Sequence, residues 1–343
     1  MSKTKVAISG TGQIGITLLR QLMDANYAGN LEVVAINDVV PVEQILASFL
    51  LNSTYGKWNG TAVLSDGNLV INGRTVKVLK VGKPAELPWK DLGIDIVFEA
   101  SGVFRNKEGA KGGYGDHIKA GAKKVILTVP AKDGGIDLTL VRGVNDNLLT
   151  AEMVYLSNAS CTTNCAAPAL KVLIALGLVK VNLTTIHAPT NDQAVRDKNH
   201  SDARRGRQTN SNIIYTSTGA AGALQKIFPD LEGKIMGQAI RVDSEGSTVK
   251  LVLTMEKELS VEEINAAFKK AADGDELKGV LKYTELPYTS KDVIGDSESC
   301  VFDSKLTRVD GTTVEVVLWY DNVLAYCVRA IEVAGKVAEL MAA

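Results

Sequence analysis

The first 150 residues alternate between short, strongly apolar runs and segments in which apolar residues recur at helical spacing. Residues 5–9 form such a run and end in a glycine-rich turn, after which Ile14, Leu18 and Leu22 lie four positions apart. Further apolar runs at 31–36, 94–99 and 124–127 are typical of buried strands. This order of strands and helices predicts an α/β domain built on a parallel sheet.

Two segments interrupt this alternation. Strands are predicted within residues 63–81, joined by Asp66-Gly67 and Asn72-Gly73, two dipeptides that favour tight hairpin turns. An antiparallel excursion is therefore expected there, after a short helix at 41–51. The crossover at 107–121 is expected to contain a helix, with His117 at the surface.

The second half has a different pattern. Residues 166–178 and 261–272 predict helices, the second with Ser260 as N-cap and Glu263 three residues further on. A strand region is expected to begin at Arg241, and a long helix is expected at 322–341. Other strands are predicted at 181–186, 249–255, 299–302 and 313–319. These elements predict an α+β domain with a mixed, largely antiparallel sheet and helices on one face.

Composition narrows the class of protein. The chain has 343 residues, enough for two domains with substantial cores. Its 38 Lys and Arg nearly balance 39 Asp and Glu, so its net charge does not favour binding to a nucleic acid or to an acidic membrane. The four cysteines have neither the density of a disulfide scaffold nor the spacing of a zinc site, and no metal is expected. With no leader and no membrane-length apolar run, a soluble cytoplasmic protein is expected.

The glycine-rich turn suits a dinucleotide. Gly10 permits a tight turn, Gly12 lets a pyrophosphate approach the backbone, and Gly15 permits close helix packing. The start of the helix attracts phosphate, and Asp38 is placed to accept hydrogen bonds from a ribose. Strand, turn, helix and acid in this order predict a dinucleotide-binding site.

Cys161 is the candidate nucleophile. A thiol near the start of a helix is stabilised as a thiolate by the helix dipole and by backbone N–H groups. The alternative is a buried thiol that acts as a small hydrophobic residue. His187 ends the predicted strand 181–186, so the two side chains can meet at one edge of a sheet. If they meet, the imidazole stabilises the thiolate and moves a proton on and off a substrate oxygen.

A long aperiodic segment, 188–212, follows His187 and is rich in arginine. One interpretation is a solvated charge run. The other is a phosphate site, because cations there lie close in sequence to hydroxyl residues and to Gly219. These features suit the oxidation of an aldehyde. The thiolate adds to the aldehyde, the bound dinucleotide accepts the hydride as a thioester forms, and a second nucleophile then releases the acyl group.

Five motifs agree with this chemistry and carry a resemblance to a known family. They are SNASCTTN around Cys161, TTIHAPTNDQ around His187, HSDARRGR from His200, TSTGAA from Thr216 and WYDN from Trp319. In these motifs the chain resembles phosphorylating glyceraldehyde-3-phosphate dehydrogenase along nearly its full length. The resemblance implies a Rossmann-type dinucleotide-binding domain of residues 1–160 and 323–343, and a catalytic domain of 161–322. It also implies a homotetramer.

The resemblance implies oxidation of glyceraldehyde 3-phosphate to 1,3-bisphosphoglycerate with NAD(P) and inorganic phosphate. Cys161 would form the hemithioacetal and thioester, with His187 as its acid-base partner. The substrate's own phosphate would bind Thr190, Asp192 and Arg241. The attacking phosphate would bind a second set, Ser160, Thr162, Thr218 and Gly219, with Arg205 close by. The cofactor would contact Gly10, Gly12, Gln13, Ile14, Gly15, Asp38, Asn322 and Tyr326.

Some residues depart from the family's usual pattern. The turn from Ser9 to Ile16 lacks the asparagine, phenylalanine and two arginines that are usual there, and Lys198-Asn199 stands where NAD-preferring members have Leu-Pro. Asp38 would repel a 2′-phosphate, whereas Lys198 would attract one. NAD is the expected cofactor, and use of NADP stays open.

Two other functions stay open at this point. Erythrose-4-phosphate dehydrogenase shares the cysteine and histidine motifs but releases its thioester to water. A dinucleotide-binding protein could instead recognise a macromolecule such as RNA through the basic loop, although residues 196–207 lack the interleaved aromatics typical of such sites.

Overall fold

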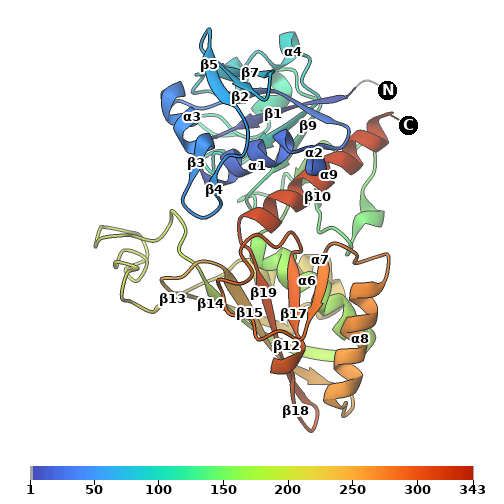
Figure 1. Ribbon diagram of the computed structural model, residues 1–343. Helices are drawn as coiled ribbons and strands as arrows, with labels where there is room; N and C mark the ends of the chain where they lie inside the picture. The colour runs from blue at the N-terminus through green and yellow to red at the C-terminus, as the bar shows by residue number, and fades with distance from the viewer. Residues whose placement is uncertain (1–2, 343) are drawn as a thin grey trace. The chain divides into compact units, whose positions relative to one another are not determined.

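The computed structural model describes residues 3–342, which divide into two compact units. One comprises residues up to Ala159 together with the segment from Cys327 on, and the other comprises Ser160–Tyr326 (Figure 1). No helix of the described residues is long and apolar enough to span a membrane.

The first unit is built on a nine-stranded sheet, in the order β10-β11-β9-β8-β1-β2-β7-β6-β5. The parallel strands are β1 (Thr4–Ser9), β2 (Leu31–Asn37), β7 (Arg74–Leu79), β8 (Ile96–Glu99), β9 (Lys124–Leu127), β10 (Leu138–Thr139) and β11 (Tyr155–Ser157). The chain winds outward from β1 in both directions, which is the Rossmann arrangement. Its helices are α1 (Gln13–Met23), α2 (Ala25–Ala28), α3 (Val42–Leu50), α4 (Trp89–Leu92), α5 (Asp116–Lys119) and α9 (Leu324–Ala342), with short 3-10 turns at Pro84–Glu86 and Asp146–Leu148.

The expected antiparallel excursion is confirmed. β5 (Ala62–Ser65), β6 (Asn68–Ile71) and β7 pair antiparallel, and the two turns place Asp66-Gly67 and Asn72-Gly73 at positive φ. Positive φ at both turn residues matches the right-handed twist of the strands, which is why these dipeptides occur there. A smaller hairpin, β3 (Leu51–Asn52) with β4 (Gly56–Lys57), precedes it.

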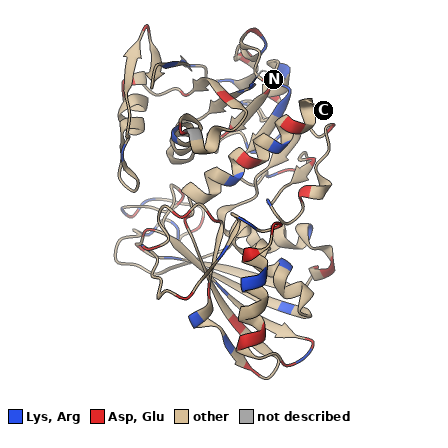
Figure 2. Ribbon diagram, turned by 45° about the vertical axis from the view of Figure 1, so that its right-hand side comes forward, with Lys and Arg blue, Asp and Glu red and all other residues tan. Residues whose placement is uncertain are grey.

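The core of this unit draws on both ends of the chain. Val6, Ile8 and Leu18 from the N-terminal segment are fully buried in one cluster with Cys327 and Ile331 of α9. Fully burying a side chain of this size contributes about 1.5–3 kcal/mol, so α9 is a structural part of the dinucleotide fold. Its sequence contains charges of both signs, and Figure 2 shows the two signs interspersed along the ribbon.

The expectation that His117 lies at the surface is wrong. Its side chain is fully buried, with Nδ1 3.0 Å from the indole nitrogen of Trp89 and Nε2 2.9 Å from Glu99 Oε2. Because indole N–H only donates, Nδ1 accepts and Nε2–H donates to Glu99. Ser101 donates to the other carboxylate oxygen from its backbone and its hydroxyl. The helix that carries His117, α5, is a single turn, shorter than the crossover pattern predicts.

The second unit has a mixed sheet in the order β13-β14-β12-β15-β19-β17-β16, with β18 beside β19. Its strands are β12 (Leu178–His187), β13 (Ile214–Thr216), β14 (Ile235–Arg241), β15 (Ser247–Met255), β16 (Leu281–Thr284), β17 (Cys300–Asp303), β18 (Arg308–Asp310) and β19 (Thr313–Tyr320). β12 pairs parallel with β14 and antiparallel with β15. The expected strand beginning at Arg241 is wrong, because Arg241 ends β14.

Three helices cover one face of this sheet. They are α6 (Cys161–Ala175), α7 (Ala220–Ile227) and α8 (Val261–Asp273), with 3-10 turns at Pro229–Leu231 and Ser304–Leu306. The capping box predicted for α8 is confirmed, since Ser260 and Glu263 exchange both hydrogen bonds. α6 begins at Cys161 itself, five residues before the predicted apolar run. The polar residues SCTTN form its first turn, where apolar periodicity gives no signal.

Candidate active site

The site of the second unit is assembled where strand ends and a helix start meet. Ser160 is the N-cap of α6 and its hydroxyl accepts from the backbone N–H of Thr163, 3.1 Å away, so Cys161 is the first helical residue. β12 ends at His187, which is 2 % exposed. The Cys161 Sγ lies 3.3 Å from His187 Nε2. The pair predicted from sequence is therefore in hydrogen-bonding contact.

Arg241 joins this pair through strand register. It stands opposite His187 in the parallel β12–β14 ladder. Its Nη1 lies 2.8 Å from His187 Nδ1 and donates to the carbonyl of Ala188 over 3.0 Å, and Nδ1 itself lies 2.7 Å from that carbonyl. A neutral imidazole with its proton on Nε2 accepts from Arg241 at Nδ1, whereas one with its proton on Nδ1 donates to Ala188 and leaves Nε2 able to accept the thiol proton. Either form of His187 thus has a partner.

The electrostatics of the pair favour neutral groups in the resting chain. Burial raises the pKa of the Cys161 thiol, although Arg241 and the backbone N–H of Thr162 act in the opposite direction. Burial and the charge of Arg241 lower the pKa of His187 to about 3. The expected thiolate stabilisation at the helix start is present but is outweighed by burial. In the resting chain, both the thiolate of Cys161 and the imidazolium of His187 are therefore disfavoured.

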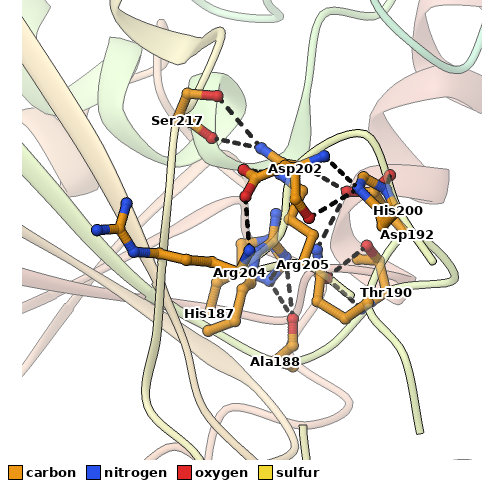
Figure 3. A network of polar contacts seen from close by, with 11 residues as sticks. His187, Ala188, Thr190, Asp192, His200, Asp202, Arg204, Arg205 and Ser217 are labelled. Carbon is orange, nitrogen blue, oxygen red and sulfur yellow. Dashed lines mark hydrogen bonds and ion pairs between the residues drawn. The ribbon is translucent and has the colours of Figure 1, made fainter. Parts of the chain in front are cut away.

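Arg205 lies at the centre of a second polar network, which Figure 3 shows from close by. Its guanidinium donates to Asp192 and, over 3.3 Å, to Asp202. The same group donates to the carbonyl of Ser217 over 3.0 Å. His200 Nε2 lies 3.4 Å from the other Asp192 oxygen. The carboxylate of Asp192 is therefore the counter-ion that fixes Arg205, an arrangement that sequence spacing does not reveal.

The remaining predicted anion ligands lie in the same unit. Thr190 donates from its backbone and its hydroxyl to Gln193 Oε1, at 3.0 Å each. Thr218 Oγ1 accepts from the backbone N–H of Ala220 at the start of α7. Gly219 is the N-cap of α7, and a Cβ added to it would meet nothing within 4 Å. An anion can therefore approach this backbone closely.

Thr162 is turned inward. It is 4 % exposed and its hydroxyl lies 3.0 Å from that of Tyr320, a buried residue at the end of β19. The Tyr320 ring also packs edge-to-face on His187, with centroids 5.8 Å apart. Sequence reasoning missed Tyr320, although it stands inside the WYDN motif at an inward position of an alternating strand. Asn322 of that motif accepts from Ser247 Oγ over 3.1 Å, which fixes the orientation of its carboxamide.

The glycine turn of the first unit fits a dinucleotide. Gly10 has φ +97°, and an added Cβ would lie 2.4 Å from the backbone nitrogen of Ser101. At Gly15 an added Cβ would lie 1.9 Å from the Gly10 carbonyl oxygen, so the turn requires both glycines. Gly12 faces open space and provides no side-chain cap for α1. The first N–H groups of this 11-residue helix are thus available to phosphate.

Asp38 is already hydrogen-bonded within the turn. Its Oδ2 accepts from Thr11 N at 2.6 Å and Thr11 Oγ1 at 2.8 Å, and its Oδ1 accepts from the backbone of Val39 at 2.7 Å. A ribose hydroxyl would share this carboxylate with Thr11. Of the remaining predicted cofactor contacts, Gln13 and Ile14 open α1, and Tyr326 is a buried residue of α9. No group of three metal-ligating side chains occurs within residues 3–342.

Comparison with known proteins gives a consistent result across the chain. Residues 4–107 match the family model of the NAD binding domain of glyceraldehyde 3-phosphate dehydrogenase, and residues 160–322 match that of its C-terminal domain. The chain is 43% identical to glyceraldehyde-3-phosphate dehydrogenase of Borreliella burgdorferi over 97% of its length and 99% of the relative. It is 43% identical to glyceraldehyde-3-phosphate dehydrogenase of Streptomyces coelicolor over 96% of both chains. It is 42% identical to glyceraldehyde-3-phosphate dehydrogenase of Zymomonas mobilis over 98% of its own length and 99% of the relative.

The buried neutral state of His187 predicts a pH effect on stability. Its pKa is about 3 in the folded chain against an ordinary 6.5, so acidification below 6.5 protonates the unfolded state first and lowers stability. Between pH 6.5 and about pH 4.5, the free energy of unfolding measured with urea should fall by about 2 kcal/mol more in wild type than in His187→Asn. Equal losses in the two proteins would mean that His187 is not held neutral.

Proposed function

Because the chain belongs to the glyceraldehyde-3-phosphate dehydrogenase family, we propose that it oxidises glyceraldehyde 3-phosphate to 1,3-bisphosphoglycerate, with NAD and inorganic phosphate. The observation that carries the proposal is the 3.3 Å contact between Cys161 Sγ and His187 Nε2, with Arg241 against the other side of the imidazole. A nucleophile, a base and a cation in this order suit covalent oxidation of a phosphorylated aldehyde.

The first step is the formation of the nucleophile. The proton of the Cys161 thiol moves to His187 Nε2, and the sulfur attacks the aldehyde carbon. In the resting chain the charge of Arg241 lowers the pKa of His187 and so disfavours the imidazolium, although it also lowers the pKa of the thiol. A substrate phosphate bound by Arg241 offsets that charge, so the imidazole becomes more basic when substrate is present. His187 Nδ1–H then has the Ala188 carbonyl as its acceptor.

His187 carries the proton through the remaining steps. It gives the proton to the oxygen of the hemithioacetal and takes it back as the carbon is oxidised. Bound NAD supplies the acceptor for the hydride that leaves this carbon. A phosphate oxygen then attacks the Cys161 thioester, the carbon–sulfur bond breaks, and the acyl phosphate leaves with the sulfur restored. One aldehyde, NAD and phosphate thus give one acyl phosphate, NADH and a proton.

Two anions must be held near one sulfur, and the site has cations and donors for both. For the substrate's phosphate we assign Arg241 and Thr190, with Asp192 acting through Arg205, to which it is ion-paired. A carboxylate would repel a phosphate, so an indirect role for Asp192 is the better fit. For the attacking phosphate we assign Ser160, Thr218, Gly219 and the backbone of Thr162, with Arg205 nearby.

The dinucleotide is assigned to the first unit. Gly10, Gly12 and Gly15 form the turn under the pyrophosphate, Gln13 and Ile14 open the helix that faces it, and Asp38 takes the ribose. In the second unit, Asn322 would orient the nicotinamide carboxamide, with Tyr326 beside it. Asp38 favours NAD by repelling a 2′-phosphate, but four protein donors already share its charge. NADP is therefore proposed as a weaker, measurable second cofactor.

We also assign the protein to the cytoplasm and to a homotetramer. All four cysteines are free thiols, which suits a reducing compartment. The sheet face opposite α6 carries three exposed apolar residues. Ile186 and Tyr215 both stand opposite Ile240 and are 38 % and 52 % exposed, and Met236, opposite Asn182, is 70 % exposed. An apolar sheet face of this kind is typical of a contact between copies of one chain.

Enzyme assays with two serine variants test the reaction. Wild type should form NADH and acyl phosphate from glyceraldehyde 3-phosphate only when phosphate is present. Cys161→Ser should lose this activity, because a hydroxyl is a far weaker nucleophile at neutral pH. The matched control is Cys165→Ser, one helical turn along α6, which should retain it. Phosphate-independent turnover of erythrose 4-phosphate, or substantial activity of Cys161→Ser, would contradict the proposed reaction.

Light scattering after size-exclusion chromatography tests the assembly. Wild type should have the mass of four chains, and Met236→Glu should shift toward smaller species because it places a charge on the open sheet face. Val63→Glu alters an equally apolar and 54 % exposed position in the first unit, and it should leave the mass unchanged. A monomeric wild type would refute the tetramer.

A further inference from the structure

A carboxylate that the proposed reaction does not use lies buried in the first unit. Glu99 ends β8 beside Ser9, the last residue of β1, and its side chain is fully buried. Its Oε2 lies 2.9 Å from His117 Nε2. Its Oε1 accepts from the backbone N–H of Ser101 over 2.9 Å and also from the Ser101 hydroxyl. Within residues 3–342 no Lys or Arg forms an ion pair with this carboxylate, so hydrogen bonds alone hold its charge.

The hydrogen bonds around His117 have only one consistent direction. The indole nitrogen of Trp89 lies 3.0 Å from His117 Nδ1, and an indole N–H can only donate. Nδ1 therefore accepts, the proton of the neutral imidazole is on Nε2, and Nε2–H donates to Glu99. Donors thus approach both side-chain oxygens of Glu99, and a carboxylate is the group that accepts on both.

Ser101 connects this carboxylate to the glycine turn. Its backbone lies against Gly10, where an added Cβ would be 2.4 Å from Ser101 N and 2.5 Å from Ser101 Cα. Gly10 in turn packs on α1, since a Cβ added to Gly15 would lie 1.9 Å from the Gly10 carbonyl oxygen. The Ser101 hydroxyl also accepts from the backbone N–H of Val103 over 3.1 Å. Glu99 therefore orders the segment of chain that packs directly on the turn.

We propose that Glu99 is a positioning residue for the dinucleotide. Its carboxylate holds the Ser101 backbone against Gly10 and so fixes the turn on which the pyrophosphate rests. Trp89 makes the position specific for a carboxylate, because it fixes the tautomer of His117. The inference rests on the proposed placement of the dinucleotide at this turn, and it adds to that site a buried group that acts from behind the turn.

Glu99→Gln tests the need for a carboxylate. The amide has nearly the same shape, but its NH2 group meets a donor in either orientation, the Nε2–H of His117 or the backbone N–H of Ser101. The Ser101 segment is then no longer held against Gly10, and the Kd of NAD should rise about tenfold. ADP keeps the pyrophosphate but lacks the nicotinamide, so its Kd should rise by the same factor.

Trp89→Phe provides both a rescue and a matched control. Without the indole N–H, His117 can carry its proton on Nδ1, and its Nε2 can then accept from the amide introduced by Glu99→Gln. The double variant should therefore recover most of the lost affinity. Trp89→Phe alone should bind NAD as wild type does, because the carboxylate still accepts from Nε2–H.

Isothermal titration calorimetry of the full chain with NAD and with ADP measures these dissociation constants. Thermal unfolding verifies that each variant folds, and Cys161, which lies in the second unit, should react with iodoacetamide at the wild-type rate in all of them. Ser101→Ala remains informative if Glu99→Gln does not fold. It removes one of the two donors from Ser101 to Glu99, and the Kd of both ligands should rise about threefold.

A rise in both dissociation constants that Trp89→Phe reverses, with Cys161 reacting normally, supports the proposal. An unchanged Kd in folded Glu99→Gln or Ser101→Ala overturns it, as does a rise that Trp89→Phe fails to reverse or that comes with altered Cys161 reactivity. A wild type that binds neither NAD nor ADP overturns it as well. A wild type that binds NAD but forms no acyl phosphate would contradict only the proposed reaction.

Discussion

The parallel pairing of β12 with β14 is the constraint on which the candidate site depends. In this ladder His187 stands opposite Arg241 at the ends of the two strands, so the base and its cation are fixed by backbone hydrogen bonds. Parallel strands need a long crossover, and the segment between them holds the aperiodic loop, β13 and α7. The same crossover carries Asp192, Arg205, Thr218 and Gly219. One topological requirement thus places these four proposed anion-site residues on the segment that joins the strand of His187 to the strand of Arg241.

The charges of the site are arranged so that the resting pair stays neutral. Burial raises the pKa of Cys161, and burial with Arg241 lowers the pKa of His187. In the proposed mechanism, a substrate phosphate bound by Arg241 offsets the charge that lowers the pKa of His187, so substrate binding is linked to activation of the thiol. Arg205 differs from Arg241, because Asp192, Asp202 and Ser217 already hold its guanidinium. Its position is therefore set before any ligand binds.

The local sequence pattern predicted much of this arrangement, and the predictions that were wrong or missing have physical causes. The glycine turn, the two hairpin dipeptides and the capping box of α8 are local signals, and the structure contains each of them. The contact of Cys161 with His187 also follows from a helix start and a strand end. Strand β14 was missed because Gly237 and Gln238 interrupt its apolar pattern. The buried state of His117 was missed because its partners, Trp89 and Glu99, come from other elements. The contacts of Tyr320 with Thr162 and His187 join β19 to α6 and β12, and no spacing along the chain encodes them.

The central claim is that Cys161 carries the substrate carbon while it is oxidised. Rapid quenching of the enzyme with glyceraldehyde 3-phosphate and NAD, in the absence of phosphate, tests it most directly. The account predicts one NADH per chain and one acyl group, found by peptide mass spectrometry on Cys161 alone. NADH formed in the burst without an acyl group on Cys161 would contradict the account.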